Sequence, residues 1–327
     1  MNVFITLLQK VRYHVFLVVI RLIRTLPYPS VLALFRFLAL LAWIVDPFHR
    51  RIARTQIHAA LDVPNVDRLV MKVFMNEGEL LVDSVRYAFL SDSEIRKRIL
   101  VEGKEHLDEA LASGRGLMIF TGHIGNWEIL SHVPRILGTR FCVMADKRND
   151  PLLESIVDEI RSRSGATILP PTGKARMLIR ELKKGRTIGM VVDKRGKPKG
   201  GLYCTVFGMP AVTNPAPAFI AIRGNALVLP VYVVKRNKAY HICFSRAVDA
   251  AGFGEGKEGI QALSDFMQSW VASVVRQYPD QWFWLYSRWL TRPDMRRVLR
   301  QGLDFREYVS QKAARGRNRH AVAHTES

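Results

Sequence analysis

The sequence predicts an α/β fold with a central, mostly parallel sheet flanked by helices, preceded by membrane-associated helices at the N-terminus. Between residues 116 and 278, short apolar runs typical of strands alternate with amphipathic runs typical of helices, which indicates parallel βαβ units. Residues 1–60 are instead strongly apolar and basic, with Asp46 as their single acidic residue. The chain is therefore divided into anchoring helices at 1–48, an α/β domain at 49–310 and a small, polar, basic tail at 311–327 that is expected to be disordered.

The N-terminal helices are predicted to lie at a membrane surface. Residues 1–26 and 31–45 are apolar but interrupted by basic residues, so neither reaches the roughly 20 clean apolar residues of a membrane span. Basic, apolar helices suit the interface of an anionic membrane, where arginine side chains reach the headgroups. Two alternatives stay open: two buried helices of a soluble bundle, and one tilted span built on 31–45. Because no small-residue cleavage site follows, a removed signal peptide is not expected.

The remaining elements follow from apolar periodicity. Helices are predicted at 50–61, 67–89, 107–111, 129–137, 151–164, 174–184 and 260–278. Strands are predicted at 116–121, 141–145, 167–169 and 187–192. The segments 210–223, 226–235 and 240–244 continue the same alternation of strand-like and helix-like runs. Ligands gather at the carboxyl ends of strands in such folds, so His123 and Asp193, which follow two of these strands, are candidates for one site.

The charge balance indicates an anionic partner. Forty-nine Lys and Arg residues stand against 29 Asp and Glu residues, a net charge of +20. Nucleic acid, an acidic protein or anionic lipid would fit this charge. The three cysteines, Cys142, Cys204 and Cys243, have no metal-type spacing, and their odd number argues against a disulfide framework. A reducing, cytoplasm-facing location is the simplest interpretation.

The run 122–128, Gly-His-Ile-Gly-Asn-Trp-Glu, is the strongest functional signal. His123 is suited to moving protons near neutral pH, and a carboxylate within reach would fix its tautomer. On one regular helix His123 and Glu128 would point about 140° apart. They can meet only if His123 lies in the loop and Glu128 in an early helical turn. A capping histidine beside an unrelated surface glutamate is the alternative interpretation.

Five segments in order resemble the lipid A late acyltransferases, the lauroyl and myristoyl transferases of Gram-negative outer-membrane lipid synthesis, within the lysophospholipid acyltransferase superfamily. The first is the H-x4-E run at 122–128. The others are 145–151, 192–196, 206–211 and 279–289, and together the resemblance extends over about residues 50–295. Three positions depart from the family pattern: Asp150 separates Asn149 from Pro151, Lys194 replaces a Gln, and Tyr286 stands where a His is common.

The resemblance implies transfer of a fatty acyl chain from an acyl-carrier-protein thioester to a hydroxyl of a lipid A precursor, without a metal or other cofactor. His123 is then expected to act as general base, held by Glu128, and backbone N–H groups around 122–126 together with Arg148 are candidates to stabilise the oxyanion. Substrate-binding residues are expected among Asn126, Trp127, Lys147, Arg148, Asp193, Lys194 and Arg195. The role of Asp193 is left open: orienting an acceptor group or a basic side chain.

The resemblance also implies partners and a location. The expected partners are acyl carrier protein, anionic membrane lipids and the glycolipid acceptor, at the bacterial inner membrane with the site facing the cytoplasm. One alternative keeps the chemistry but changes the acceptor to a phospholipid or another envelope glycolipid. A remote alternative is a non-enzymatic, basic nucleic-acid-binding protein, although no nucleic-acid-binding motif is present.

Overall fold

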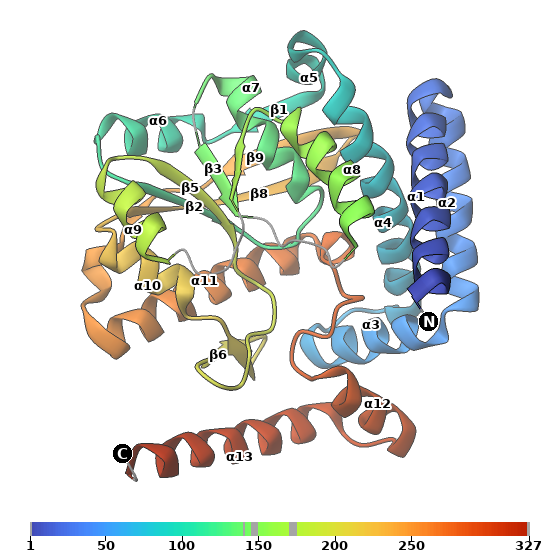
Figure 1. The fold of residues 1–327 in the computed structure, drawn as a ribbon. Helices are drawn as coiled ribbons and strands as arrows, with labels where there is room; N and C mark the ends of the chain where they lie inside the picture. Colours follow the sequence, from blue (N-terminus) through green and yellow to red (C-terminus); the bar gives the residue numbers. More distant parts are fainter. Residues whose placement is uncertain (1, 140, 145–149, 170–174, 326–327) are drawn as a thin grey trace.

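The computed structural model describes residues 2–139, 141–144, 150–169 and 175–325. Within them, a twisted sheet forms the centre of the α/β domain (Figure 1) in the order β1-β9-β8-β2-β5-β3-β4. The strands are β1 (Ile99–Glu102), β9 (Ala239–Phe244), β8 (Leu227–Arg236), β2 (Leu117–Thr121), β5 (Thr187–Val191), β3 (Phe141–Met144) and β4 (Thr167–Leu169), and β10 (Val248–Asp249) pairs with β8. Neighbours on this path are parallel except β8 and β9. The predicted fold class is confirmed.

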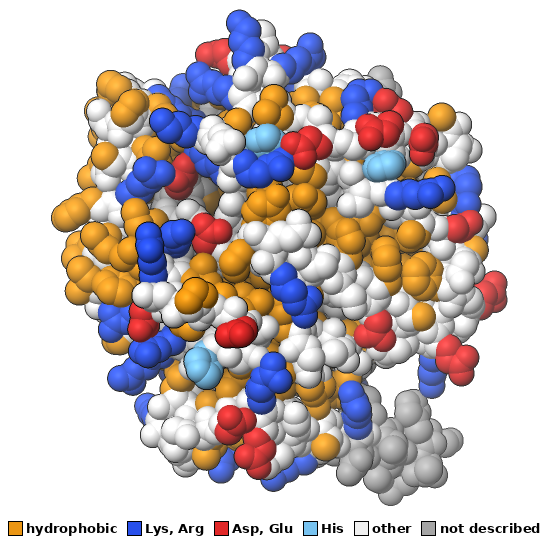
Figure 2. Space-filling model, turned by 180° about the vertical axis from the view of Figure 1, so that it is seen from behind, with side chains coloured by type: hydrophobic (Ala, Val, Ile, Leu, Met, Phe, Trp, Pro, Cys, Tyr) orange, Lys and Arg blue, Asp and Glu red, His pale blue; other side chains and the backbone are white. Residues whose placement is uncertain are grey.

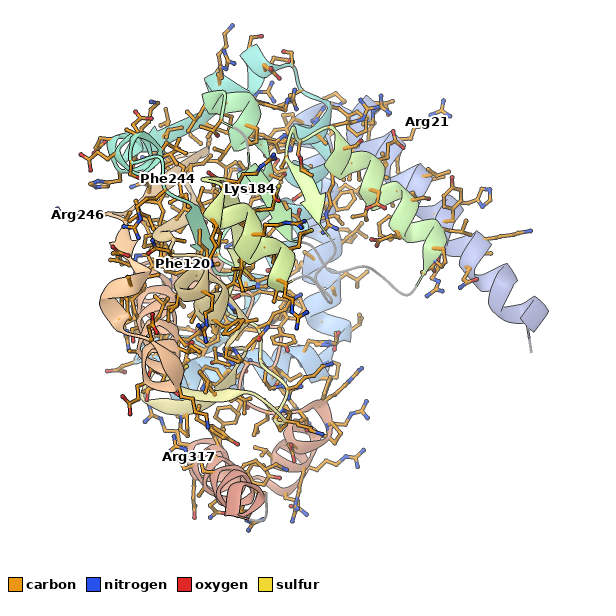
Figure 3. All side chains as sticks on the ribbon, turned by 60° about the vertical axis from the view of Figure 1, so that its left-hand side comes forward. Arg21, Phe120, Lys184, Phe244, Arg246 and Arg317 are labelled. Atoms are coloured by element: carbon orange, nitrogen blue, oxygen red, sulfur yellow. The ribbon has the colours of Figure 1, made fainter. Side chains whose placement is uncertain are left out.

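Helices cover both faces of the sheet, and side chains alternate between them. Met118 and Phe120 of β2 point into a core cluster with α9 (Ala175–Lys183), α10 (Ala216–Arg223) and α11 (Gly256–Gln277). Leu117 and Ile119 point into a second cluster with α6 (Lys104–Ala112) and the segment after β2. Phe120 and Phe244, labelled in Figure 3, belong to these two different clusters.

The connection from β8 to β9 is not the helical crossover between parallel strands that the sequence predicted for this region. The two strands form an antiparallel hairpin that pairs Arg236 with Ala239. Asn237 and Lys238 between them both have positive φ angles, 49° and 68°. Two such residues form the type of tight turn that matches the twist of a hairpin, so no helix intervenes.

The helix predicted at 129–137 is two shorter elements. A 3-10 helix, η1 (Trp127–His132), leads into α7 (Val133–Leu137). Pro134 lies in the first turn of α7, where its missing N–H costs nothing, but it could not continue an α-helix from residue 130. The chain therefore leaves β2 through a loop and a tight turn before α7 begins.

At the N-terminus, α1 (Asn2–Thr25) and α2 (Tyr28–Val45) stand beside the domain (Figure 1), and α3 (Pro47–Ala60) leads to α4 (Val66–Phe89). One stripe of α2, Val31, Phe35 and Ala39, is buried, and α2 packs on α4. Seen from behind, apolar and basic side chains mingle along this edge of the molecule (Figure 2). Among the described residues α2 is the one helix long and apolar enough to cross a membrane, and 11% of it is buried. The structure thus disfavours the buried-bundle alternative.

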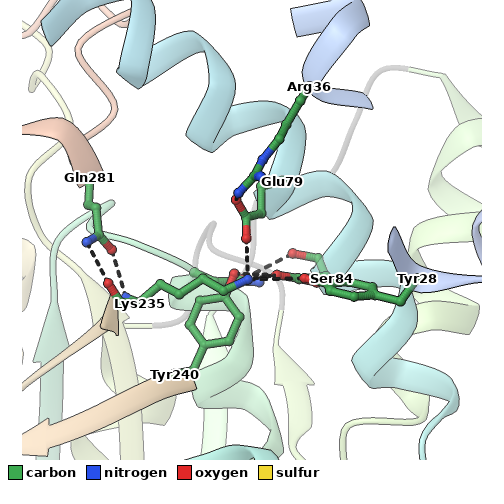
Figure 4. A network of polar contacts seen from close by, with 9 residues as sticks. Tyr28, Arg36, Glu79, Ser84, Lys235, Tyr240 and Gln281 are labelled. Carbon is green, nitrogen blue, oxygen red and sulfur yellow. Dashed lines mark hydrogen bonds and ion pairs between the residues drawn. The ribbon is translucent and has the colours of Figure 1, made fainter. Parts of the chain in front are cut away.

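A polar network joins α2, α4 and β8 (Figure 4). The ammonium of Lys235 contacts Glu79, lies 3.0 Å from Asp83 Oδ2 and donates to the Tyr28 hydroxyl at 3.1 Å. Arg36 of α2 donates to Glu79 at 2.9 Å. Desolvation would lower the pKa of Lys235, but the two carboxylates outweigh it and raise that pKa above its usual value.

The end of the chain corrects the prediction of a disordered tail. After α12 (Arg292–Gln301), helix α13 extends over Phe305–Thr325 and packs on β7 (Met209–Thr213) and α3. Val309 and Ala313 are buried in that contact. The composition is basic, but alanine, arginine, lysine and glutamine are strong helix formers. Phe305, Val309 and Ala313, spaced four apart, form the buried face of this helix. Seven further elements among the described residues were not predicted: α5 (Asp92–Arg98), β1, β6 (Leu202–Val206), β10, η2 (Ala250–Phe253), η3 (Pro279–Gln281) and α12.

Candidate active site

Strand register brings His123 and Asp193 together. Strands β2 and β5 are parallel neighbours in which Thr121 pairs with Val191. His123 and Asp193 each lie two residues beyond that pair, so both occupy the same carboxyl edge of the sheet. The backbone of β5 continues the ladder for one more bond, because Val192 N donates to Thr121 O at 2.9 Å.

Three donors converge on the Asp193 carboxylate, which is 3% exposed. Oδ1 lies 2.6 Å from His123 Nδ1. Oδ2 accepts from the backbone N–H of His123 and from the Trp282 indole N–H, both at 2.7 Å. Burial would raise the pKa of Asp193, but the His123 charge and these hydrogen bonds outweigh it and lower that pKa to about 2. Asp193 is therefore ionised at neutral pH.

The ionised carboxylate determines the tautomer of His123. A carboxylate only accepts hydrogen bonds, so Nδ1 carries the hydrogen and Nε2 keeps its lone pair. The imidazole packs edge-on against Trp127, with ring centroids 4.7 Å apart, and near Phe283. The ring is thus oriented by a charge on one side and by aromatic rings on the other, and none of the residues that the structure describes bonds to Nε2.

Gly122 allows this close approach. A Cβ atom at position 122 would lie 2.9 Å from Asp193 Oδ2 and 3.0 Å from a methyl group of Val271. At Gly125, which has a φ angle of 52°, a Cβ atom would lie 2.0 Å from the carbonyl oxygen of Val233. The atoms around the loop therefore leave no room for a side chain at either glycine of the motif.

The expected contact between His123 and Glu128 is not the one that the structure shows. His123 lies in the loop and Glu128 lies in η1, as the spacing required. However, Nδ1 bonds to Asp193, and the Glu128 carboxylate pairs instead with Arg161 of α8 (Pro151–Ser162) at 3.6 Å. The 3-10 turn at residue 127 and the buried position of Asp193 explain the difference. In the structure the carboxylate that holds the imidazole is that of Asp193. A catalytic role of Glu128 stays a prediction.

The backbone donors proposed for an oxyanion are largely engaged. His123 N–H donates to Asp193, Ile124 N–H to the carbonyl of Gly122 at 2.8 Å, and Gly125 N–H to the carbonyl of Gln281 at 2.6 Å. These bonds rigidify the loop but leave three N–H groups unavailable to a substrate. Arg148, the other candidate, lies outside the described residues, as does Lys147.

A cavity of about 1230 Å³ opens beside His123. Trp127, Glu128, Lys194 and Arg195 line it together with His123, so five predicted site residues share one space. Asn126 lies elsewhere: it is 1% exposed, and its side-chain oxygen Oδ1 accepts from the Ser84 hydroxyl of α4 at 3.0 Å. The remaining charged residues that line the cavity are Arg161, Arg176, Lys197 and Lys199. Among the described residues, no group of three or more His, Cys, Asp or Glu is placed to hold a metal ion.

Sequence reasoning missed how the segment 282–288 supports the site. Trp282, which is buried in the core, also hydrogen-bonds to Asp193. Arg288 is 1% exposed and donates to Val212 O, Thr213 Oγ1 and Gln268 Oε1, while Gln268 donates to the carbonyl of Val192. Burial lowers the pKa of Arg288 to about 10, so it stays charged. The motif at 279–289 was the available signal, but its contacts depend on the tertiary fold.

A sequence model described as bacterial lipid A biosynthesis acyltransferase matches residues 2–291. The chain is 26% identical over 277 residues to a lipid A biosynthesis palmitoleoyltransferase of Escherichia coli, covering 82% of this chain and 87% of that protein. It is 24% identical over 293 residues to the lipid A biosynthesis lauroyltransferase of the same organism, covering 84% and 90%.

Two further similarities cover a smaller share of this chain. A phosphatidylinositol mannoside acyltransferase of Mycobacterium tuberculosis is 26% identical over 196 residues, covering 58% of this chain and 60% of that protein. The crystal structure of a 1-acyl-sn-glycerophosphate acyltransferase from Thermotoga maritima aligns with a TM-score of 0.37 and 18% identity, covering 77% and 96% of the two chains.

Proposed function

The chain belongs to the bacterial lipid A biosynthesis acyltransferase family, and from that premise we propose that it moves a fatty acyl chain from an acyl-carrier-protein thioester to a hydroxyl of a lipid A precursor. The observation that carries the mechanism is the pair of His123 and Asp193, in which a buried, ionised carboxylate holds Nδ1 of a ring that lines the cavity. Within the described part of the chain, Nε2 has no hydrogen-bond partner.

The proposed reaction is one addition and one elimination. Nε2 of His123 takes the proton of the acceptor hydroxyl as the hydroxyl oxygen attacks the thioester carbonyl carbon. Asp193 stabilises the imidazolium that forms. When the tetrahedral intermediate collapses, the C–S bond breaks, and the proton passes from His123 to the departing thiolate. The products are the ester and the free thiol, and the proposal uses no metal or cofactor.

The charged lining of the cavity supports an anionic acceptor. Lys194, Arg195, Lys197 and Lys199 follow Asp193 directly, so they cluster beside the proposed base. Arginine and lysine bind phosphate and carboxylate groups, which a lipid A precursor carries. The net charge of +20 also supports binding to an acidic carrier protein and to anionic lipids.

A second acceptor class has specific support. The relative from M. tuberculosis is named a phosphatidylinositol mannoside acyltransferase, so a mannosylated phospholipid is the alternative acceptor for the same chemistry. We further propose that α1 and α2 bind the protein to the bacterial inner membrane with the cavity on the cytoplasmic side, where the carrier protein is available. The exposed apolar side of α2 supports this location.

The test is an assay of the purified full-length protein with acyl-carrier-protein thioesters and each acceptor in turn, analysed by mass spectrometry. We expect ester formation on the lipid A precursor, and a loss of about 10²–10⁴-fold in kcat for His123→Ala. Circular dichroism checks that this variant is folded, because the substitution leaves the buried Asp193 carboxylate without its partner. Transfer only to the mannosylated lipid would select the second acceptor. Wild-type kcat in His123→Ala would exclude the proposed base.

A further inference from the structure

The segment that carries Asp193 leads from β5 into a hairpin. Strand β5 ends at Val191, and the N–H of Val192 extends the ladder by one bond. The next element along the chain is β6, which forms an antiparallel hairpin with β7. Residues 193–196 lie outside both strands, so their positions depend on tertiary bonds to other segments.

Strand β7 supplies two of these bonds. The N–H of Gly196 donates to the carbonyl of Val212 at 2.8 Å, and Arg195 forms an antiparallel bridge with Thr213. The two segments are in close contact, since a Cβ atom at position 196 would lie 2.7 Å from the carbonyl carbon of Thr213. Asn214 comes next in the chain and lines the cavity, as Arg195 and Gly196 do. Two segments that line the cavity therefore meet at the end of β7.

The buried guanidinium of Arg288 bonds to the same end of β7. Its Nη1 donates to the carbonyl oxygen of Val212 at 2.8 Å, the oxygen that also accepts from Gly196. Its Nη2 donates to Thr213 Oγ1 at 2.7 Å. Because the guanidinium is planar and offers its donors in a rigid fork, it sets the relative positions of the two acceptors. Arg288 thus fixes the strand end against which the segment after Asp193 packs.

A second branch from the same guanidinium leads to the residue before Asp193. Nη2 of Arg288 donates to Gln268 Oε1 at 3.1 Å, and Gln268 Nε2 donates to the carbonyl of Val192 at 2.9 Å. Arg288 and Gln268 are each 1% exposed, so these bonds form in a low-dielectric interior. Burial lowers the pKa of Arg288, and the Asp193 carboxylate is the charge that most opposes this lowering. Both ends of the segment 192–196 are therefore attached to one buried cation.

From these contacts we propose that Arg288 is a positioning residue of the acyl transfer, which holds the Asp193 carboxylate in place for His123. Through β7 the same side chain holds Lys194 and Arg195 in the cavity, where they meet the anionic acceptor. The inference rests on the proposed function and deepens it, because it gives one buried residue an effect on both catalysis and acceptor binding. A displacement of about 1 Å from the productive geometry can cost about 10²-fold in rate.

The experiment compares Arg288→Lys with the wild-type protein in steady-state kinetics, varying the acyl-carrier-protein thioester and the lipid A precursor in turn. Lysine keeps the buried cation but carries its donors on a single nitrogen, so it does not reproduce the fork. We expect kcat to fall by about 10–10²-fold. The KM for the acceptor should rise by about tenfold, the size expected for one weakened contact to a charged group, while the KM for the thioester stays unchanged.

The KM for the acceptor separates positioning from a general loss of stability. A less stable protein has a smaller active fraction, which lowers the measured kcat and leaves both KM values as they were. The matched control is Arg276→Lys, the same exchange in α11, where the exposed Arg276 guanidinium lies 5.0 Å from the centroid of the Phe207 ring. This control should keep the wild-type kcat and both wild-type KM values.

The outcomes separate the inference from the proposed function. A wild-type protein that esterifies no acceptor would reject the proposed function and the inference with it. If the wild-type protein is active, a folded Arg288→Lys variant with an unchanged KM for the acceptor would overturn the inference alone.

Two further variants decide if circular dichroism shows that Arg288→Lys is unfolded. Gln268→Met removes the branch to Val192 and should mainly lower kcat. Thr213→Val removes one hydroxyl from the other branch and should mainly raise the KM for the acceptor. Wild-type kinetics in both variants would overturn the positioning role of Arg288.

Discussion

The imidazole of His123 has a carboxylate on Nδ1 and aromatic rings beside it, and this asymmetry makes it a candidate base. The buried carboxylate of Asp193 fixes the hydrogen on Nδ1. Trp282 and the backbone of His123 fix the carboxylate in turn. If the carboxylate were not fixed in this way, the imidazole could exchange tautomers. Here the hydrogen stays on Nδ1 and the lone pair on Nε2.

The first prediction separates the two carboxylates. Asp193→Asn places an amide on Nδ1 and should lower kcat by about 10²–10⁴-fold, because the imidazolium loses its counter-charge and its tautomer is no longer fixed. Glu128→Gln should mainly raise KM, because Glu128 lines the cavity and pairs with Arg161. Steady-state kinetics of both variants measure the difference. A larger kcat loss in Glu128→Gln than in Asp193→Asn would return the supporting role to Glu128.

The second prediction concerns His132, a buried histidine 4% exposed at the end of η1. Burial, followed by the charge of Arg135, lowers the pKa of His132 from 6.5 to about 4. Between these values the unfolded chain binds a proton that the folded chain does not, so the free energy of unfolding falls as the pH falls from 6.5 towards 4.

At pH 5 the difference amounts to roughly 2 kcal/mol relative to pH 7. In His132→Gln this contribution is removed, so the melting temperature should depend less on pH between 4 and 6.5 than in the wild-type protein. Thermal melting in detergent at several pH values measures the effect. Parallel curves for the two proteins would contradict it.

At the scale of elements, the Lys235 network connects the N-terminal helices to the loop of His123. Besides its contacts with α2 and α4, Lys235 exchanges two backbone hydrogen bonds with the Gln281 side chain, at 2.8 and 3.1 Å. The carbonyl of Gln281 accepts from Gly125 N–H in the motif loop. One strand residue thus holds three separate segments of the chain.

The third prediction follows from this position. Lys235→Met leaves Glu79 and Asp83, 7% and 1% exposed, without their shared cation, and should cost about 3–5 kcal/mol of unfolding free energy. The control is its neighbour Arg236→Met, whose ion pair with Glu102 is partly solvated and should contribute at most about 1 kcal/mol. Denaturant unfolding of both variants compares them, and equal losses would refute the importance of the network.

At the scale of the whole molecule, α1 and α2 form an edge beside the α/β domain (Figure 1). Apolar and basic side chains lie together along this edge (Figure 2). Arg21 projects outward from this edge in Figure 3. Phe37, Leu41 and Ile44 of α2 are 62%, 43% and 55% exposed. Exposed apolar residues gathered on one helix mark a surface that contacts lipid or another protein.

The fourth prediction tests the lipid contact. Combined substitution of Phe37, Leu41 and Ile44 by Ser should move the protein from the membrane fraction to the supernatant, because each apolar side chain removed from water contributes about 1.5–3 kcal/mol. The wild-type protein should stay in the membrane fraction in 1 M salt, where surface charge attraction is screened. The matched control replaces Leu100 and Leu303, exposed leucines at 51% and 38% elsewhere on the surface. Release of that control to the same extent would contradict the assignment.

The amino-acid sequence by itself determined the elements that depend on local pattern. The alternation of apolar runs predicted the parallel sheet, the spacing from 122 to 128 placed His123 in a loop and Glu128 in a turn, and the family of the chain followed from ordered motifs. Each of these features depends on residues that are close together in the chain, so periodicity and spacing predict it.

Only the tertiary structure decided which groups meet. It brought Asp193 rather than Glu128 to His123, joined Trp282 to Asp193 across 89 positions of sequence, and placed Gly189 between Ile119 and Val143. It also docked the tail as α13 and made β8 and β9 a hairpin. Such contacts depend on strand order and register in a sheet, which bring distant residues together and which no local window of sequence contains.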